Sequence, residues 1–141
     1  MVAEGSRRDL TDGRRAAIGF CFGGGNVLEL ARDGADLAAA VSIHGDLKTA
    51  APAKPGAVKA ALLAAHGAPD PVGPKADRDA FEQEMDAAGA KWQTLVFSGV
   101  LHAYTDQGAD VHGVAAWNEL ACRQTYALAH QFIADAFAGR L

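Results

Sequence analysis

Short apolar runs alternate with amphipathic stretches along most of this chain. Four of the runs are typical of strands buried on both faces, at residues 16–20, 37–44, 60–65 and 91–97. Apolar residues at helical spacing predict helices over 23–32, from Pro74 to Gly89, and from Asn118 to about residue 138. Strands separated by helices or crossover loops favour a parallel sheet. We therefore expect an α/β fold of three layers, with a mainly parallel sheet of about four strands and flanking helices.

Turn-forming and capping residues mark the ends of these elements. Asp33-Gly34 is expected to stop the first helix, and Pro74 suits the first position of the second helix. Gly89 ends the second helix, and Asn118 can cap the last one. The stretches 45–59, 66–71 and 98–117 are expected to be loops or turns.

Length, charge and cysteine content narrow the classes of protein. A chain of 141 residues that is half hydrophobic suits a single globular domain spanning 1–141, with residues 1–15 as a polar lead-in that is not a secretory signal. A net charge of −4 gives no support to nucleic-acid or anionic-membrane partners, and no apolar run approaches the ~20 residues of a membrane span. Cys21 and Cys122 make neither a disulfide framework nor a C-x-x-C motif. We expect a cytoplasmic protein with free thiols.

Cys21 stands in a glycine-rich turn between the first strand and the first helix. The motif Gly19-Phe-Cys-Phe-Gly23 matches the Gly-x-nucleophile-x-Gly elbow, which lifts its central side chain out of the backbone. Only the thiolate of a cysteine attacks carbonyls, and a helix N-terminus directly behind Cys21 is expected to favour that anion. The turn therefore predicts an acyl-transfer nucleophile.

Further candidate residues follow the later strands. Ligands of parallel sheets bind beyond the carboxyl ends of the strands, where the chain places Cys21, Asp70 and His102 in three different loops. Nucleophile, acid and histidine in this order match the hydrolase arrangement, in which the acid orients the histidine and the histidine takes the proton. The backbone N–H of Phe22 is the expected oxyanion donor.

Each of these residues also has a purely structural interpretation. A single cysteine in an apolar context is more often an inert core residue, Asp70 in Pro-Asp-Pro can be a turn former, and His102 can be an ordinary loop residue. The remaining histidines and cysteine are assigned structural roles: His44 and His66 as wall or hydrogen-bonding residues, His112 as a distant loop residue, His130 as structural or exposed, and Cys122 as a packing residue. The histidines lack close helical metal-ligand spacing, and no G-x-G-x-x-G fits the glycine run.

Several motifs together resemble the dienelactone hydrolase family of the α/β-hydrolase superfamily. They are Ile18-Gly-Phe-Cys-Phe-Gly-Gly24, Val41-Ser-Ile-His-Gly45, Ala65-His-Gly-Ala-Pro-Asp-Pro-Val72, the helix 81–89, Val100-Leu-His-Ala-Tyr-Thr105 and Trp117-Asn-Glu119. The resemblance covers about residues 14–138. It implies a Cys21-His102-Asp70 triad and hydrolysis of a small-molecule lactone or ester with no metal or organic cofactor.

The resemblance also implies that this chain is the C-terminal portion of an α/β-hydrolase fold. Family members carry further strands before the elbow, and that region supplies a second oxyanion N–H, a glutamate that holds the thiol and an arginine for the substrate carboxylate. Lactone-cleaving members also place an arginine shortly after the catalytic histidine, where this chain has Asp106 four residues on.

We therefore expect a truncated α/β-hydrolase domain that cleaves a lactone or carboxylic ester through Cys21. The alternative is a non-catalytic remnant that acts as a binding or dimerising module. Such a module would complete its sheet as a homodimer or by pairing with a separate N-terminal segment, because its first strand would otherwise leave an open apolar edge. A thiol redox protein is a weaker alternative, since no resolving cysteine lies near Cys21.

Overall fold

The computed structural model describes residues 12–141, so most of the predicted lead-in lies outside the described residues. The elements in chain order are β1 (Ala16–Phe20), α1 (Phe22–Arg32), β2 (Ala39–Ile43), β3 (Ala61–Gly67), α2 (Lys75–Ala88), β4 (Trp92–Phe97), β5 (Asp110–Val111), β6 (Ala115–Ala116) and α3 (Glu119–Phe137).

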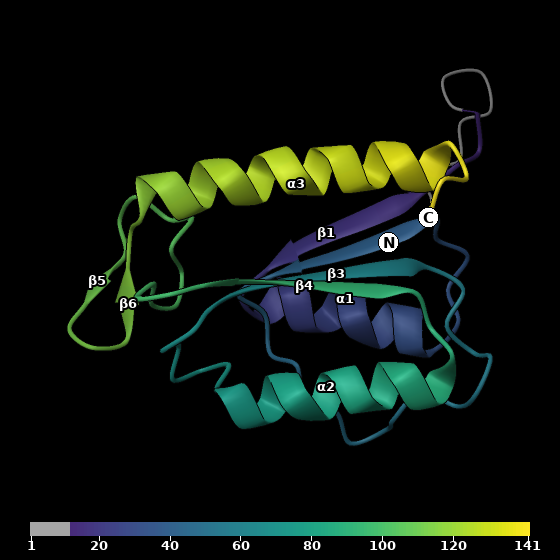
Figure 1. Ribbon diagram of the computed structural model, residues 1–141, viewed down its shortest axis with the longest axis horizontal. Coiled ribbons are helices and arrows are strands. Elements are labelled where there is room, and N and C mark those ends of the chain that lie inside the picture. The colour runs from purple at the N-terminus through teal and green to yellow at the C-terminus, as the bar shows by residue number, and fades with distance from the viewer. Residues whose placement is uncertain (1–11) are drawn as a thin grey trace.

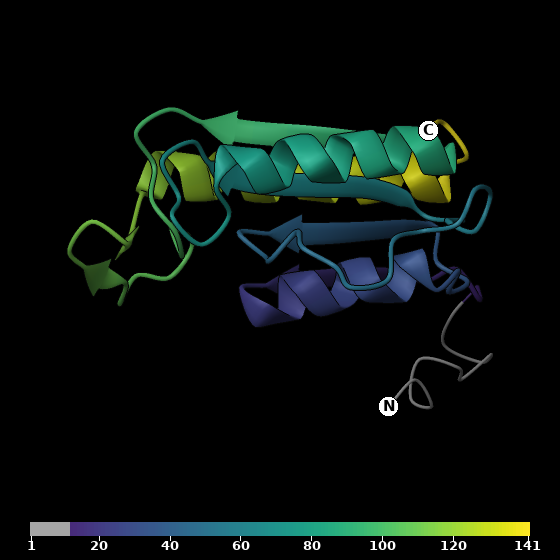
Figure 2. The ribbon, with the colours of Figure 1, turned by 90° about the horizontal axis from the view of Figure 1, so that it is seen from below.

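Four parallel strands form the main sheet in the order β1-β2-β3-β4. Helices α1 and α2 cover one face and α3 runs across the other, so the domain has three layers (Figure 1; Figure 2 shows the α1 and α2 side). The predicted α/β architecture with a four-stranded parallel sheet is confirmed. All four strands end on the same side of the sheet, which gathers the loops that follow them.

Two apolar cores lie on the two faces of the sheet. β2 and β3 are buried along their whole length, as strands covered on both faces should be. Alternate residues of these strands point to the α1/α2 side and to the α3 side. The first core includes Val27, Leu28, Ala40, Leu62, Ala64, Phe81 and Met85, and the second includes Val41, Ile43, Leu63, Tyr104, Ala129 and Phe132.

The element boundaries differ from the sequence predictions in a few places. β1 and the end of α2 at Gly89, which adopts the left-handed conformation, are as predicted, and the Asn118 side chain caps α3 by accepting from the N–H of Ala121. β3 continues through His66 and Gly67, because these residues pair with the end of β4. Pro74 is the N-cap of α2 and not its first residue.

The predicted loop 98–117 also contains a small element that the sequence analysis missed. β5 and β6 pair as a two-stranded antiparallel hairpin, each strand two residues long. In Figure 1 the hairpin lies at the end of the molecule toward which the main strands run. Strands this short have no hydrophobic periodicity, so the pattern gave no signal for them.

A buried ion-pair network joins α1 to α2. The Arg32 guanidinium donates to both carboxylate oxygens of Glu84 at 2.9 and 2.8 Å and to the carbonyl of Leu47 at 2.9 Å. Burial alone would raise the pKa of the Glu84 carboxyl, but hydrogen bonds from Arg32 and from the N–H of Ala53 outweigh it and hold that pKa below its ordinary value. The network fixes the two helices on the same face of the sheet.

The outer edge of β1 is uncovered. Among residues 12–141, β1 pairs with β2 alone, and the side chains of Ile18 and Phe20 are 45% and 38% exposed. Ile18 also borders an apolar cavity of about 320 Å³ with Tyr126, Ile133 and Phe137. This edge therefore presents both unpaired backbone groups and apolar side chains to solvent.

Within residues 12–141, no helix has the length and apolar character needed to cross a membrane.

Candidate active site

Cys21 occupies a strained turn between β1 and α1. Its φ of 48° and ψ of −123° are unusual for a residue with a side chain, and it is the N-cap of α1. The glycines around it permit this geometry: a Cβ on Gly19 would lie 2.0 Å from the Gly23 carbonyl oxygen, and one on Gly24 would lie 2.7 Å from Ser42 Oγ. The sequence thus folds as the predicted elbow, because no residue larger than glycine fits at either position.

The surroundings of the Cys21 thiol favour its protonated form. Burial raises the pKa of the thiol, and the carboxylates of Asp106 and Asp70 raise it further. Burial and these two carboxylates therefore act against the anion that the helix N-terminus is expected to favour. Ionisation of Cys21 requires a neighbouring group that accepts the proton.

Asp70 and His102 form a hydrogen-bonded pair at the same edge of the sheet. Asp70 follows β3 and His102 follows β4, and His102 Nδ1 lies 2.9 Å from Asp70 Oδ2. The Asp70 side chain is fully buried, whereas the His102 side chain keeps 14% of its surface exposed. Nδ1 donating to the carboxylate leaves the His102 Nε2 lone pair free to take a proton.

Buried contacts hold the Asp70 carboxylate in place. Its Oδ1 accepts from the backbone N–H groups of Val72 at 2.7 Å and Gly73 at 3.2 Å. Burial alone would raise the pKa of Asp70, but the bonds from His102 and from these two N–H groups outweigh it, so the pKa lies below its ordinary value. Asp70 is therefore a carboxylate at neutral pH.

The buried side chain of Arg78 fixes the loop that carries Asp70. Arg78 lies on α2, is 6% exposed, and donates to the carbonyls of Gly67, Ala68 and Gly73 at 2.6–3.3 Å. One guanidinium thus joins both ends of the loop around Asp70. Sequence reasoning did not identify Arg78, because nothing in the local pattern links a helix arginine to that loop.

The β5–β6 hairpin fixes the loop that carries His102. The His102 N–H donates to the Val114 carbonyl at 3.0 Å, and the Ala116 N–H donates to the His102 carbonyl at 3.2 Å. Two residues on, a hydrogen bond of 2.9 Å joins the Tyr104 hydroxyl to that of Thr125 on α3. The hairpin and α3 together set the position of the imidazole.

His44 contacts Cys21 directly, and this is the main feature that sequence reasoning missed. It follows β2 with a φ of 39°, is 2% exposed, and its Nδ1 lies 3.3 Å from Cys21 Sγ. The Cys21 N–H also donates to Nδ1 at 3.3 Å, and Nε2 lies 2.7 Å from Thr105 Oγ1. Burial lowers the pKa of His44 to about 4, and the neighbouring His102 adds to the shift. His44 is therefore neutral, with its proton on Nε2 and the Nδ1 lone pair toward the thiol.

One sulfur and two imidazoles therefore meet at the carboxyl edge of the sheet. Sγ of Cys21 and one ring nitrogen each of His44 and His102 all lie within 4.8 Å of one another. Of the residues selected from sequence, the structure brings Cys21, Asp70 and His102 into one cluster. His44 was expected only to line a wall or make a hydrogen bond.

The other sequence candidates lie outside this cluster. His66 is fully buried in β3; neither ring nitrogen has a hydrogen-bond partner within residues 12–141, and burial lowers its pKa to about 4. His112 and His130 are exposed, and Cys122 is buried in α3. Phe22 is the first residue of α1, so its N–H belongs to the turn whose donors have no partner within the helix.

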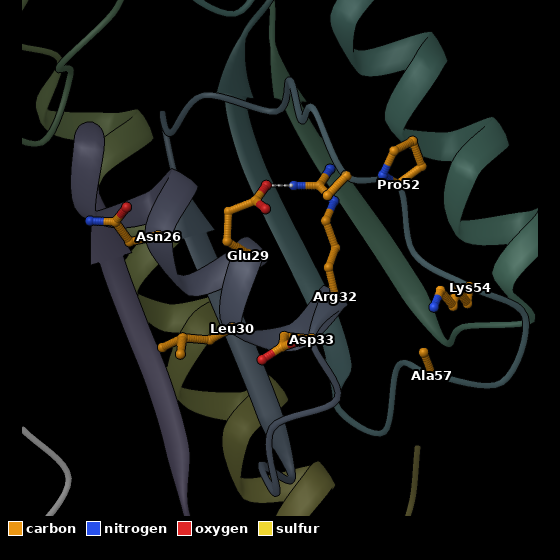
Figure 3. A pocket seen from close by; sticks show the side chains of 9 residues that line it. Asn26, Glu29, Leu30, Arg32, Asp33, Pro52, Lys54 and Ala57 are labelled. Carbon is orange, nitrogen blue, oxygen red and sulfur yellow. Dashed lines mark hydrogen bonds and ion pairs between the residues drawn. The ribbon is translucent and has the colours of Figure 1, made fainter.

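A separate cavity of about 790 Å³ lies along α1, away from this cluster (Figure 3). Its lining includes Glu29, Arg32, Asp33 and Lys54. Arg32 is already bonded to Glu29 and Glu84, as the dashed line in Figure 3 marks for the first of them, so its charge is satisfied within the protein. The reactive groups therefore lie at the carboxyl ends of the strands and not in this cavity.

Comparison with known proteins identifies relatives along almost the whole chain. The sequence model of the dienelactone hydrolase family matches residues 5–135. The solved structure of m3DLH is 34% identical to this chain, with a TM-score of 0.84. The matched region covers 93% of this chain and 55% of the m3DLH chain. A dienelactone hydrolase-like promiscuous phosphotriesterase from metagenomic libraries is 31% identical with a TM-score of 0.82, and covers 94% of this chain and 56% of its own.

More distant structures share the fold alone. An α/β-hydrolase enzyme from a Medee basin deep-sea metagenome library is 16% identical with a TM-score of 0.66, and covers 86% of this chain and 53% of its own. No curated protein matches the chain. The chain spans about half the length of the solved relatives that it matches.

Proposed function

Because the chain belongs to the dienelactone hydrolase family, we propose that it hydrolyses a carboxylic ester or lactone through the thiol of Cys21. One observation carries this proposal: the buried Asp70–His102 pair lies at the same sheet edge as Cys21, whose sulfur is within 4.8 Å of a ring nitrogen of His102. A thiol, an imidazole and an orienting carboxylate are the three groups that covalent acyl transfer needs.

In the proposed reaction His102 is the general base and Asp70 its orienting acid. His102 Nε2 takes the thiol proton, the sulfur attacks the ester carbonyl, and the tetrahedral intermediate expels the alcohol after His102 returns the proton to it. Water, deprotonated by His102, then attacks the thioester and releases the acid and the free thiol. Asp70 stabilises the imidazolium in both halves, because its carboxylate accepts from Nδ1 throughout.

We assign His44 a different role from that of His102. Both imidazoles are near the sulfur, but His44 is buried, its pKa is about 4, and its second nitrogen faces the hydroxyl of Thr105 and not a carboxylate. A buried imidazole without a carboxylate partner is a weak general base at neutral pH. His44 Nδ1 accepts from the resting thiol and so holds the sulfur close to His102.

The Phe22 N–H is the proposed oxyanion donor. It directly follows the nucleophile at the start of α1, where backbone donors point out of the helix end. Each such donor contributes about 10²–10³ in rate in other hydrolases.

The charge around Cys21 favours neutral substrates. The negative charges of Asp106 and Asp70 act on the thiol, and they also repel a substrate that carries a carboxylate of its own. We therefore propose a neutral ester or lactone in place of a dicarboxylate-like lactone. A neutral phosphotriester is a second candidate, supported by the metagenomic relative described as a promiscuous phosphotriesterase.

The free thiols of Cys21 and Cys122 support a reducing compartment such as the cytoplasm.

The alternative proposal is a non-catalytic module that binds through its uncovered β1 edge. It is supported by the exposure of Ile18 and Phe20 there. A homodimer or a complex with a separate N-terminal segment would satisfy the edge. Hydrolysis by a stable monomer would rule this alternative out.

The hydrolase proposal is tested with Cys21→Ala. We expect turnover of p-nitrophenyl acetate to fall by about 10⁴-fold or more, since loss of a nucleophile removes the covalent route. Intact-mass spectrometry during wild-type turnover should detect an added acetyl group that the variant lacks. Cys122→Ala, which removes the other thiol, is the matched control and should retain activity. Undiminished hydrolysis by Cys21→Ala would refute the assignment.

A further inference from the structure

The cluster of Cys21, His44 and His102 has the spacing of a metal-ion site. Their ligand atoms all lie within 4.8 Å of one another, and Cys21 Sγ is 3.3 Å from His44 Nδ1. In a tetrahedral zinc site with Zn–S near 2.3 Å and Zn–N near 2.0 Å, neighbouring ligand atoms lie about 3.3–3.6 Å apart. Closing the remaining gap needs a movement of about 1 Å by His102, whose side chain is partly exposed.

Each imidazole is held by a group on the nitrogen that faces away from the cluster. His102 Nδ1 bonds Asp70 Oδ2 at 2.9 Å, and His44 Nε2 bonds Thr105 Oγ1 at 2.7 Å. Metal-binding histidines nearly always have such a partner, because it fixes the ring and directs the other lone pair at the metal. The carboxylate–histidine arrangement of Asp70 and His102 is a known form of this support in zinc sites.

Metal binding would leave no buried donor without a partner. The Cys21 N–H, which contacts His44 Nδ1 in this structure, also donates to the Ile43 carbonyl at 3.1 Å. Nδ1 can therefore turn to a cation at the cost of one weak contact. The carboxylates of Asp70 and Asp106 act on Cys21 and add negative potential for a cation to neutralise.

We propose that Cys21, His44 and His102 bind a thiophilic divalent cation such as Zn²⁺ through Sγ, Nδ1 and Nε2, and that the bound ion blocks Cys21. One thiolate and two imidazoles are the ligand set that zinc prefers over magnesium or calcium. The S–H bond breaks, a Zn–S bond forms, and the proton leaves to solvent. Three protein ligands leave a fourth position open to water, because Cys21 and His102 are only partly buried.

The binding test uses the purified full chain, stripped of metal, with ZnCl₂ and CoCl₂ as probes. Calorimetry should give one Zn²⁺ per chain, and Co²⁺ should produce a thiolate-to-cobalt charge-transfer band in the near ultraviolet. Cys21→Ala should abolish that band, and His44→Asn, a side chain suited to the positive φ, should weaken Zn²⁺ binding by tenfold or more. Thr105→Val should weaken binding about 10- to 100-fold through the lost support of His44.

Cys122→Ala and His130→Ala are the matched controls, since both lie on α3 outside the cluster. They should bind as the wild type does, and circular dichroism should be unchanged in every variant. Zinc binding that survives in both Cys21→Ala and His44→Asn, or no binding at micromolar Zn²⁺, would overturn the proposal. These readouts do not depend on turnover, so the site is tested even if the hydrolase assignment fails.

The block on Cys21 is the part that rests on the proposed function. Stoichiometric Zn²⁺ should slow alkylation of Cys21 by iodoacetamide and stop p-nitrophenyl acetate turnover, and EDTA should restore both. Alkylation that proceeds at the same rate with and without bound zinc would show that the sulfur is not a ligand.

Discussion

At the scale of single residues, the site is defined by the unequal surroundings of two imidazoles. His102 has a carboxylate on Nδ1, whereas His44 has a hydroxyl on Nε2 and a pKa lowered to about 4 by burial. The same residue type near the same sulfur thus has two different chemical roles. Because only a carboxylate stabilises an imidazolium strongly, proton transfer is assigned to His102.

This difference predicts unequal losses for the two histidines. His102→Ala should lower kcat/KM for p-nitrophenyl acetate by about 10²–10⁴, the usual contribution of a general base. His44→Asn should lower it by about fivefold, equivalent to one neutral hydrogen bond to the thiol. Stopped-flow assays on both variants compare these values. A larger loss in His44→Asn than in His102→Ala would reverse the two roles.

At the scale of elements, the reactive side chains sit on loops that helices and a hairpin hold in place. Arg78 on α2 bonds three carbonyls around Asp70, and the β5–β6 hairpin bonds both backbone groups of His102. The loops after parallel strands are thereby fixed to rigid elements on two sides of the sheet. Such fixing keeps the carboxylate and imidazole at hydrogen-bonding distance before substrate arrives.

Arg78→Leu should reveal this fixing. Three carbonyls lose their donor, and those of Gly67 and Gly73 are buried, so we expect the free energy of unfolding to fall by about 2–4 kcal/mol. The kcat should fall more than KM changes, because Asp70 no longer holds His102 in its productive position. Chemical denaturation and steady-state kinetics measure the two effects.

Arg123→Leu is the matched control, since Arg123 is exposed on α3. It should leave both quantities unchanged. Arg78→Lys should recover part of the loss, because its ammonium can still reach one or two of the carbonyls. A fold of unchanged stability in Arg78→Leu would contradict the role given to the guanidinium.

The helices and strands could be predicted from sequence where turn-forming or helix-capping residues mark their ends. Glycines on both sides of Cys21 located β1 and the elbow, and Gly89 and Asn118 located helix ends. The end of β3 was placed too early, because a polar histidine looked like a turn residue while its backbone pairs with β4.

The site could be predicted only in part. The sequence predicts that Cys21, Asp70 and His102 lie close together, because each is in a loop after a strand and the carboxyl ends of parallel strands meet at one end of the sheet. The contact of His44 with Cys21 depends on a backbone φ of 39° in a non-glycine residue, for which the sequence has no signal. The raised pKa of the thiol depends likewise on burial and on Asp106, a residue far away in sequence.

At the scale of the whole molecule, the uncovered β1 edge is an exposed apolar feature. Ile18 and Phe20 are both exposed apolar residues of β1, and Ile18 borders the apolar cavity that Tyr126 and Ile133 of α3 also line. Edges of this kind pair with other chains unless a charge or a bulge prevents it. β1 carries neither within its five residues.

We therefore expect the isolated chain to self-associate through β1. Sedimentation velocity over a range of concentrations should detect species larger than a monomer, and Ile18→Lys should shift them to monomer, since a lysine on an edge strand opposes pairing. Val111→Lys, at an exposed apolar residue in the β5–β6 hairpin, is the matched control and should not do so. A wild-type chain that stays monomeric at every concentration would contradict this expectation.

The order β1-β2-β3-β4 has a consequence for how the chain acquires its structure during synthesis. β2, β3 and β4 each pair with the strand that precedes them in the chain, so each finds the edge it pairs with already made. A ribosome releases residues at roughly 5–20 per second, far more slowly than local structure forms. Assembly can therefore keep pace with translation from β1 onward. The Asp70–His102 pair, whose second member follows β4, closes only after these four strands have formed.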